Sequence, residues 1–320
     1  MKILFYLFIY SNILDLSSSE CHKKGKLIKK KRKKQIILSG EPPKEFILLP
    51  PSITAIKNLS YCPYYSPKEK EFAEMPIRYK HGISIIITAY KMEKFIKETL
   101  DSISNQTWFK KNENWEIIVG IDGCNNTLKT VFSIMKNYKN LRVFMMEENK
   151  GTYITTNSMM SIAKYDNLLR FDADDIMMPN LVELTMNESE SSDVDRIMFK
   201  SKNFGNNSTS IGWAVGQIFM KHWVFDYFGG FMPWKCEGDR EFINRIDQFL
   251  IIKHINKVLM KRRIHDSNLT VNNETGLYSI FRRWHKSYRI NVSMKIKNIN
   301  QAVIIKTIDN YYEIFSDSII

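Results

Sequence analysis

The sequence predicts an α/β fold of one large domain, with a mainly parallel sheet flanked by helices. Two observations support this prediction. Apolar runs typical of buried strands alternate with segments of helical periodicity, and polar or acidic residues directly follow several of these runs. The chain of 320 residues is 44% hydrophobic and 12% aromatic, which excludes a disordered protein. Its 13 glycines and the lack of a sustained heptad pattern exclude collagen-like and coiled-coil classes.

The expected elements begin with a strand over Ile83–Ile87, which is rich in β-branched residues. A helix follows, because five residues at helical spacing share one face: Phe95, Ile96, Thr99, Leu100 and Ile103. The alternation then continues with a strand over Trp115–Ile121, a helix over Leu128–Tyr138, a strand over Leu141–Met146, a helix over Tyr153–Ala163 and a strand over Asn167–Phe171.

Charge is distributed unevenly along the chain. Of the net charge of +13, residues 1–80 carry +9, residues 81–270 carry +1 and residues 271–320 carry +3. Most of the excess lies between Lys23 and Lys34, a run with nine basic residues and no acidic one. Such a run is a localisation signal, a patch for anionic lipid or another polyanion, or a solvated tail. Because the middle segment is nearly neutral, we expect no nucleic acid on it.

These features divide the chain into four segments: an apolar N-terminus with the basic run over 1–35, a proline-rich lead-in over 36–80, the α/β domain over 81–270 and a C-terminal helical extension over 271–320. The first residues, MKILFYLFIY, resemble a short signal peptide, although the polar residues Asn12 and Asp15 interrupt the apolar segment. A cleaved signal would place the chain in the secretory pathway or at a membrane; otherwise it would be cytoplasmic. The basic and aromatic stretch 278–296 either contacts a membrane surface or packs as a helix on the domain.

The residues after the strands carry the candidate chemistry. Ligands of parallel sheets bind beyond the carboxyl ends of the strands, and the last predicted strand is followed by Asp172-Ala173-Asp174-Asp175. Three carboxylates within four residues repel one another unless a cation neutralises them. Hard oxygen ligands suit Mg²⁺ or Mn²⁺ held beside a diphosphate. The alternative is that Asp174 or Asp175 caps a helix that begins near Pro179.

Four blocks in this order carry a resemblance: SIIITAY (Ser84–Tyr90), EIIVGIDG (Glu116–Gly123), ENKGTYITTN (Glu148–Asn157) and LLRFDADDIMMPN (Leu168–Asn180). Together they resemble the family 2 glycosyltransferases, which have the Rossmann-like GT-A fold. The resemblance implies a hexosyltransferase-like enzyme that inverts the anomeric carbon and depends on Mn²⁺ or Mg²⁺. It also implies a nucleotide-sugar donor, most simply a UDP-sugar, and a saccharide or glycoconjugate acceptor.

The resemblance assigns donor-binding roles to seven residues. They are Thr88, Ala89 and Tyr90 beside the base and ribose, Asp122 on the uracil or ribose, Gly151 and Asn157 flanking the donor, and Asp172 at the diphosphate. The metal ligands would be Asp172 and Asp174, which form the D-x-D motif, together with His265 of RIHDSN. Thr156 stands where the family usually has an arginine, and Lys150 is a potential substitute.

Inverting transfer also needs a base, because the acceptor hydroxyl loses its proton as the nucleotide leaves. The segment CEGDREFINR resembles the family's E-D-x-E-F helix and places Asp239 in the base position, although Gly238 replaces the usual glutamate. Glu241 and Trp234 are the expected acceptor contacts.

Two other functions remain open from the sequence. A nucleotidyltransferase on a related fold would need a glycine-rich loop after the first strand, and Thr88–Glu93 lacks the glycines. A non-catalytic polyanion-binding protein would rely on the basic run.

Overall fold

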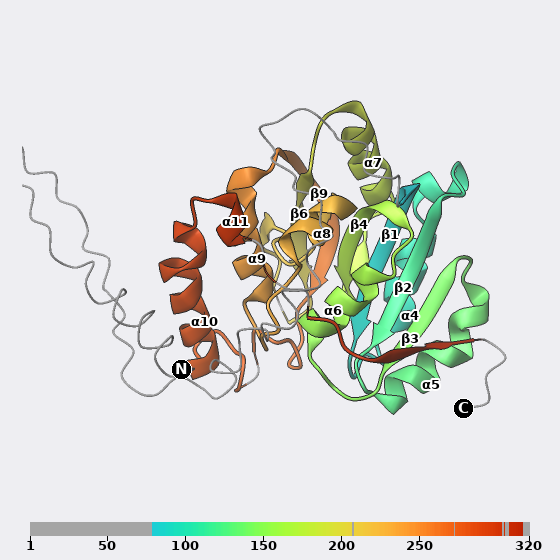
Figure 1. The fold of residues 1–320 in the computed structure, drawn as a ribbon. Helices are drawn as coiled ribbons and strands as arrows, with labels where there is room; N and C mark the ends of the chain where they lie inside the picture. Colours follow the sequence, from blue (N-terminus) through green and yellow to red (C-terminus); the bar gives the residue numbers. More distant parts are fainter. Residues whose placement is uncertain (1–78, 207, 272, 303, 305–306, 316–320) are drawn as a thin grey trace, which may run out of the picture. The chain divides into compact units, whose positions relative to one another are not determined.

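A computed structural model describes residues 79–206, 208–271, 273–302, 304 and 307–315 (Figure 1). All of them belong to one compact unit, Gly40–Ile320. The signal-like segment, the basic run and nearly all of the proline-rich lead-in lie outside the described residues. Within the described part of the chain, no helix is both long and apolar enough to cross a membrane.

A ten-stranded sheet runs through the described residues in the order β10-β3-β2-β1-β4-β8-β6-β9-β5, with β7 paired to β6. Its parallel half consists of β1 (Lys80–Ala89), β2 (Trp115–Ile121), β3 (Leu141–Met146) and β4 (Tyr165–Asp172). The other strands are β5 (Ile176–Met177), β6 (Arg196–Phe204), β7 (Ile211–Trp213), β8 (Phe219–Lys221), β9 (Ile252–Arg263) and β10 (Tyr311–Ile314). β8 joins the parallel half antiparallel to β4, whereas β6 and β9 pair in parallel.

Helices cover both faces of the sheet, so the domain has three layers (Figure 1). Alternate side chains of β1 enter opposite cores: Ile85 packs in one and Ile86 in the other. The first core is shared with α4 (Ile96–Ser104), α5 (Asn125–Ile134) and α7 (Leu181–Ser191). The second is shared with α6 (Thr152–Ser161), α8 (His222–Phe228), α9 (Gly238–Ile246) and α11 (Ile299–Ala302). The remaining helix, α10 (Ile280–Asn291), packs beside α9.

The predicted fold class is confirmed, and the bounds of β2 and β3 agree with the prediction to the residue. The helix predicted over Leu128–Tyr138 begins earlier, at Asn125, and its end tightens into a 3₁₀ turn, Met135–Asn137. The suggested cap is wrong, because Asn180, and neither aspartate, occupies the N-cap position of α7. The C-terminal extension is not wholly helical, because β10 adds an antiparallel strand beside β3.

Candidate active site

The acidic segment begins inside the sheet. Asp172 is the last residue of β4 and lies opposite Thr88 of β1. Its Oδ1 is 2.7 Å from Nη2 of Arg170, and its Oδ2 accepts a hydrogen bond of 2.6 Å from Nε2 of Gln217. The Gln217 side chain also accepts the backbone N–H of Asp172, at 3.0 Å. The Asp172 carboxylate is therefore fixed by the segment that precedes β8.

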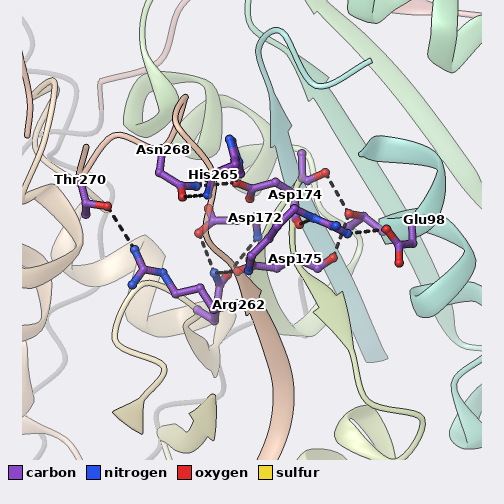
Figure 2. A network of polar contacts seen from close by, with 12 residues as sticks. Glu98, Asp172, Asp174, Asp175, Arg262, His265, Asn268 and Thr270 are labelled. Atoms are coloured by element: carbon purple, nitrogen blue, oxygen red, sulfur yellow. Dashed lines mark hydrogen bonds and ion pairs between the residues drawn. The ribbon is translucent and has the colours of Figure 1, made fainter. Parts of the chain in front are cut away.

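Asp174 faces the segment that follows β9 (Figure 2). Its Oδ2 lies 2.8 Å from Nε2 of His265 and accepts a bond of 3.0 Å from Nδ2 of Asn268. Burial raises the pKa of Asp174, the charge of Asp172 adds to the rise, and the hydrogen bond with His265 opposes it. Asn268 also accepts the backbone N–H of His265 through Oδ1, at 2.8 Å, which closes the loop around Asp174.

The Asp175 carboxylate forms hydrogen bonds with residues next to this cluster. It is buried, accepts the backbone N–H of Arg263 at 2.8 Å through Oδ1, and accepts Nε2 of Gln217 at 3.1 Å through Oδ2. Burial and the charges of Asp174 and Asp172 raise the pKa of Asp175 well above its usual value.

The expected metal ligands are not arranged as one shell. Among the described residues, no group of three or more His, Cys, Asp or Glu side chains is placed to hold a metal ion. Asp172 contacts Arg170 and Gln217, whereas Asp174 contacts His265. The donor set nevertheless fits a divalent cation, because Mg²⁺ keeps several waters and needs only one or two protein ligands beside substrate phosphates. Burial and the neighbouring carboxylate of Asp172 raise the pKa of Asp174. A bound cation would therefore stabilise the charged form of Asp174.

Asp239 approaches the same place from another element. It lies in the first turn of α9, and its Oδ1 accepts the hydroxyl of Tyr153 at 3.0 Å. A Cβ added at Gly216 would lie 3.3 Å from Asp239 Oδ2, 3.5 Å from Arg170 Nη1 and 3.9 Å from Asp172 Oδ2. Two carboxylates and a guanidinium from distant parts of the sequence therefore surround one glycine.

Arg170 is the main residue of this site that sequence reasoning missed. It is buried within β4, pairs with Asp172 and donates to the carbonyl oxygen of Gly216. Burial lowers the pKa of Arg170, but the nearby negative charges of Asp172 and Asp239 outweigh this effect and raise it overall. The available signal was a single basic residue inside the apolar strand LLRFD, directly before the acidic segment.

The expected donor residues divide into exposed and buried groups. Tyr90 is 40% exposed, and Thr88 is partly exposed with its Oγ1 2.9 Å from Oγ1 of Thr152. Ala89 is buried in the core. Asp122 is buried and accepts the backbone N–H groups of Lys150, at 2.7 Å, and of the next residue, Gly151, at 2.9 Å. Gly151 has φ of 91°, which favours glycine.

Asn157 does not contact the donor side as expected. It is fully buried, its Nδ2 donates to the carbonyl of Phe231 at 2.9 Å, and its Oδ1 accepts the N–H of Phe231 at 3.0 Å. Its role here is to join α6 to the loop before α9. Lys150 does not stand free in place of the missing arginine, because its Nζ pairs with Glu148 at 2.5 Å and with Asp309 at 3.0 Å.

Neither expected acceptor contact is presented to a ligand. Trp234 is buried and stacks on the ring of His285 in α10, with ring centroids 4.5 Å apart. Glu241 is fully buried, pairs with Nε of Arg245 at 2.9 Å and accepts the hydroxyl of Ser293 at 3.0 Å. Both residues hold the C-terminal part of the domain together, which corrects the sequence-based assignment.

Comparison with solved structures defines the class of fold. The chain is similar to residues 1–349 of TarS from S. aureus in complex with UDP-GlcNAc, with a TM-score of 0.54, 17% identity and coverage of 68% of this chain and 69% of that one. It is also similar to the mannosyltransferase PcManGT from Pyrobaculum calidifontis in complex with GDP-Man and Mn²⁺, with a TM-score of 0.53 and 14% identity over 77% and 71% of the two chains. These likenesses define the glycosyltransferase type of α/β fold.

The family follows from the sequence comparison. The model of glycosyl transferase family 2 matches residues 84–283, more than half of the chain. The chain belongs to glycosyl transferase family 2, and the family expected from the four sequence blocks is confirmed. An uncharacterized glycosyltransferase of Haemophilus influenzae is 34% identical over 112 residues, which are 35% of this chain and 33% of that protein. The chain spans less than half the length of the curated relatives it matches.

Proposed function

We propose that this protein transfers a sugar, with inversion, from a UDP-sugar to a hydroxyl of a saccharide or glycoconjugate acceptor, using Mn²⁺ or Mg²⁺. The observation that carries the proposal is the convergence of Asp239, Asp172 and Arg170 around Gly216. This convergence supports the proposal because Asp239, our candidate base, lies beside the carboxyl end of β4, where ligands of parallel strands bind. Two similar structures, TarS with UDP-GlcNAc and PcManGT with GDP-Man and Mn²⁺, support a nucleotide-sugar donor.

The proton transfer belongs to Asp239. In an inverting step, the acceptor oxygen forms a bond to the anomeric carbon while the bond to the diphosphate breaks, and the electron pair leaves with the nucleotide. The acceptor proton passes to Oδ2 of Asp239, because Oδ1 is held by the Tyr153 hydroxyl. The hydrogen bond from Tyr153 thus fixes the carboxylate so that Oδ2 faces Gly216, the side of Asp172 and Arg170.

The donor diphosphate requires positive charge. A divalent ion held by Asp174 and His265 would neutralise charge on the departing diphosphate. Arg170 adds a fixed cation at the same edge, and its geometry is set by Asp172 and by the carbonyl of Gly216. We assign the nucleoside side to Thr88, which is partly exposed near the end of β1, and to Tyr90, which is 40% exposed directly after β1.

The test is metal-dependent release of nucleoside diphosphate from a panel of sugar nucleotides. We expect Asp239→Asn to lower turnover by at least about a hundredfold, the lower range for loss of a general base. We expect Asp174→Ala, which removes a ligand of the proposed metal ion, to abolish metal-dependent turnover. Asp193→Asn is the matched control, because Asp193 is exposed in the segment before β6 and should leave turnover unchanged.

The two variants should differ in binding. Asp239→Asn should still bind donor in the presence of Mn²⁺, whereas Asp174→Ala should lose the metal-dependent part of donor binding. Release of pyrophosphate instead of nucleoside diphosphate would support a nucleotidyltransferase, and metal-independent turnover by Asp174→Ala would exclude the proposed mechanism.

A further inference from the structure

Exposed apolar side chains are concentrated in one short stretch of the chain. Among the described residues, fourteen large hydrophobic side chains are exposed, and half of them lie between residues 269 and 294. They are Leu269, Val271, Leu277, Tyr278, Ile280, Ile290 and Met294, with Tyr278 91% exposed and Leu277 60% exposed. We call this set the apolar stretch. A concentration of exposed apolar side chains of this kind marks an interaction surface more often than chance.

The same stretch is basic. From Thr275 to Ile308 the sequence contains seven Lys or Arg residues and no Asp or Glu. Two of the arginines, Arg282 and Arg289, pair with the buried carboxylate of Glu237. The side chains of four others are exposed: Arg283, Lys286, Lys295 and Lys297. The charge that faces solvent here is therefore mainly positive, because the exposed Glu274 within this part of the chain is paired with Lys235 at 2.6 Å.

Apolar and basic side chains share the outer side of α10. Ile280, Arg283 and Ile290 lie at spacings of three and seven residues, which places them on one side of a helix, and all three are exposed. Leu277 and Tyr278 directly precede this helix. The inner side carries Arg282 and His285, which are buried. Figure 1 shows α10 on the outer side of α9, away from β2 and β3.

The segment is held in place by its own contacts. Ser279 caps α10 by accepting the N–H of Arg282 at 3.2 Å. The guanidinium of Arg282 donates to the carbonyl oxygens of Thr275, at 2.7 Å, and Leu269, at 3.3 Å. Leu277 donates its N–H to the carbonyl of Thr270 at 3.1 Å. Leu277 and Tyr278 are thus exposed at a turn whose backbone is fixed, which lowers the entropy lost on contact with a partner.

We propose that the apolar stretch and the cations around it form a docking surface for a bilayer that contains anionic lipid. Large apolar side chains, with a tyrosine at the tip, enter the headgroup boundary, while Arg283, Lys286, Lys295 and Lys297 bind the lipid phosphates. The combination of exposed apolar side chains with an excess of exposed cations favours this partner over a neutral or cationic one.

The surface begins close to the proposed active site. Asn268, which binds Asp174, directly precedes Leu269 in the chain. Docking would therefore hold the acidic cluster near the membrane surface. The proposal concerns binding alone and stands whether or not the proposed reaction is correct.

The test measures binding of the full chain to vesicles of phosphatidylcholine alone and to vesicles with one third phosphatidylglycerol, by co-sedimentation. We expect binding to the anionic vesicles, weakened in high salt, and little binding to the neutral ones. The pair Leu277→Ser with Tyr278→Ser, and separately Arg283→Glu with Lys286→Glu, should each weaken binding about tenfold. All four side chains are exposed, so the fold should be retained.

Matched controls come from other surfaces of the chain. Ile251→Ser removes an apolar side chain that is 57% exposed, and Lys129→Glu reverses an exposed charge on α5. Neither should change binding. Equal binding to both vesicle types, no binding to either, or unchanged binding by both double variants would overturn the proposal. Nucleoside diphosphate release, measured in solution in parallel, should be the same in the four variants and the wild type, which separates this result from a failure of the proposed function.

Discussion

Asp122 illustrates what one carboxylate contributes to the site. Its two oxygens accept the N–H groups of two successive residues, Lys150 and Gly151, directly before α6. The role is to fix the backbone of the loop that begins α6, and the expected contact with uracil or ribose remains a prediction. Because the residue is 2% exposed, its effect on stability should be measurable apart from its effect on donor binding.

Replacing Asp122 with Asn should lower the free energy of unfolding by about 1–3 kcal/mol, because the amide has one acceptor oxygen and a buried N–H loses its partner. Burial raises the pKa of Asp122. The stability linked to that shift is fully present below the usual carboxyl pKa and is lost as the pH rises through the raised value in the folded state. The difference in stability between wild type and Asp122→Asn should therefore increase when the pH is lowered from neutral towards the usual carboxyl pKa. Urea unfolding at both ends of this range checks this, and a difference that decreases on acidification would contradict it.

For single residues, the sequence predicts which positions belong to the candidate site better than it predicts the contacts of their side chains. Sequence reasoning selected Asp172, Asp174 and Asp239 as candidates, because carboxylates after a buried strand or at a helix start are recognisable from the chain alone, and their roles remain predictions. It misassigned Asn157 and Glu241, whose partners, Phe231 and Arg245, fully occupy them. The direction of a side chain depends on long-range packing, and a linear pattern does not contain it.

Among the elements, α10 directly contacts α9, the helix that carries the proposed base Asp239. Glu237, at the N-cap position of α9, has φ of 66° and a buried carboxylate. Arg282 of α10 donates to that carboxylate at 2.6 Å, and Arg289 lies 3.4 Å from it. Helix α10 thus fixes the turn at Glu237, two residues before Asp239.

We predict that Arg282→Met destabilises the protein by about 3–5 kcal/mol, because it leaves the buried charge of Glu237 with a single, longer ion pair. The double variant Arg282→Met with Glu237→Gln should regain part of this loss, because the uncompensated charge is removed as well. Thermal or urea unfolding of the wild type, both single variants and the double variant gives the coupling energy. Additive effects of the two substitutions would show that the pair does not hold α9.

Two strands, β2 and β3, show where the local sequence pattern is sufficient to predict an element. β2 and β3 were predicted to the residue, because β2 is buried along its whole length and β3 along most of it, and the ends of both runs coincide with polar residues. The short antiparallel strands β7 and β8 escaped prediction, because three residues each are too few for a period to emerge. Yet the turn between them carries Gly216 and Gln217, which complete the site around Asp172.

For the molecule as a whole, Gln217 connects the two halves of the sheet at the site. Its side chain binds Asp172 on the parallel strand β4 and Asp175 beyond it, while its backbone leads into β8. The acidic cluster therefore depends on both halves being folded.

The order of the strands has a further consequence. In the described sheet, the two end strands are β10, with four residues, and β5, with two. Short end strands leave few unpaired backbone groups on which another chain could add a strand. Without β10, the end of the sheet would be β3, six residues long and with four consecutive buried residues, Val143–Met146.

A chain that ends before Thr307 should therefore self-associate more strongly than the full chain, because two β3 edges can pair. Light scattering during gel filtration over a range of concentrations measures this, with Tyr312→Ser as a control that keeps β10 but removes an exposed ring. Identical masses for the shortened and full chains would refute it. If the shortened chain pairs and the full chain does not, a four-residue strand at the end of the sheet sets the concentration that this protein can reach before two copies join along β3.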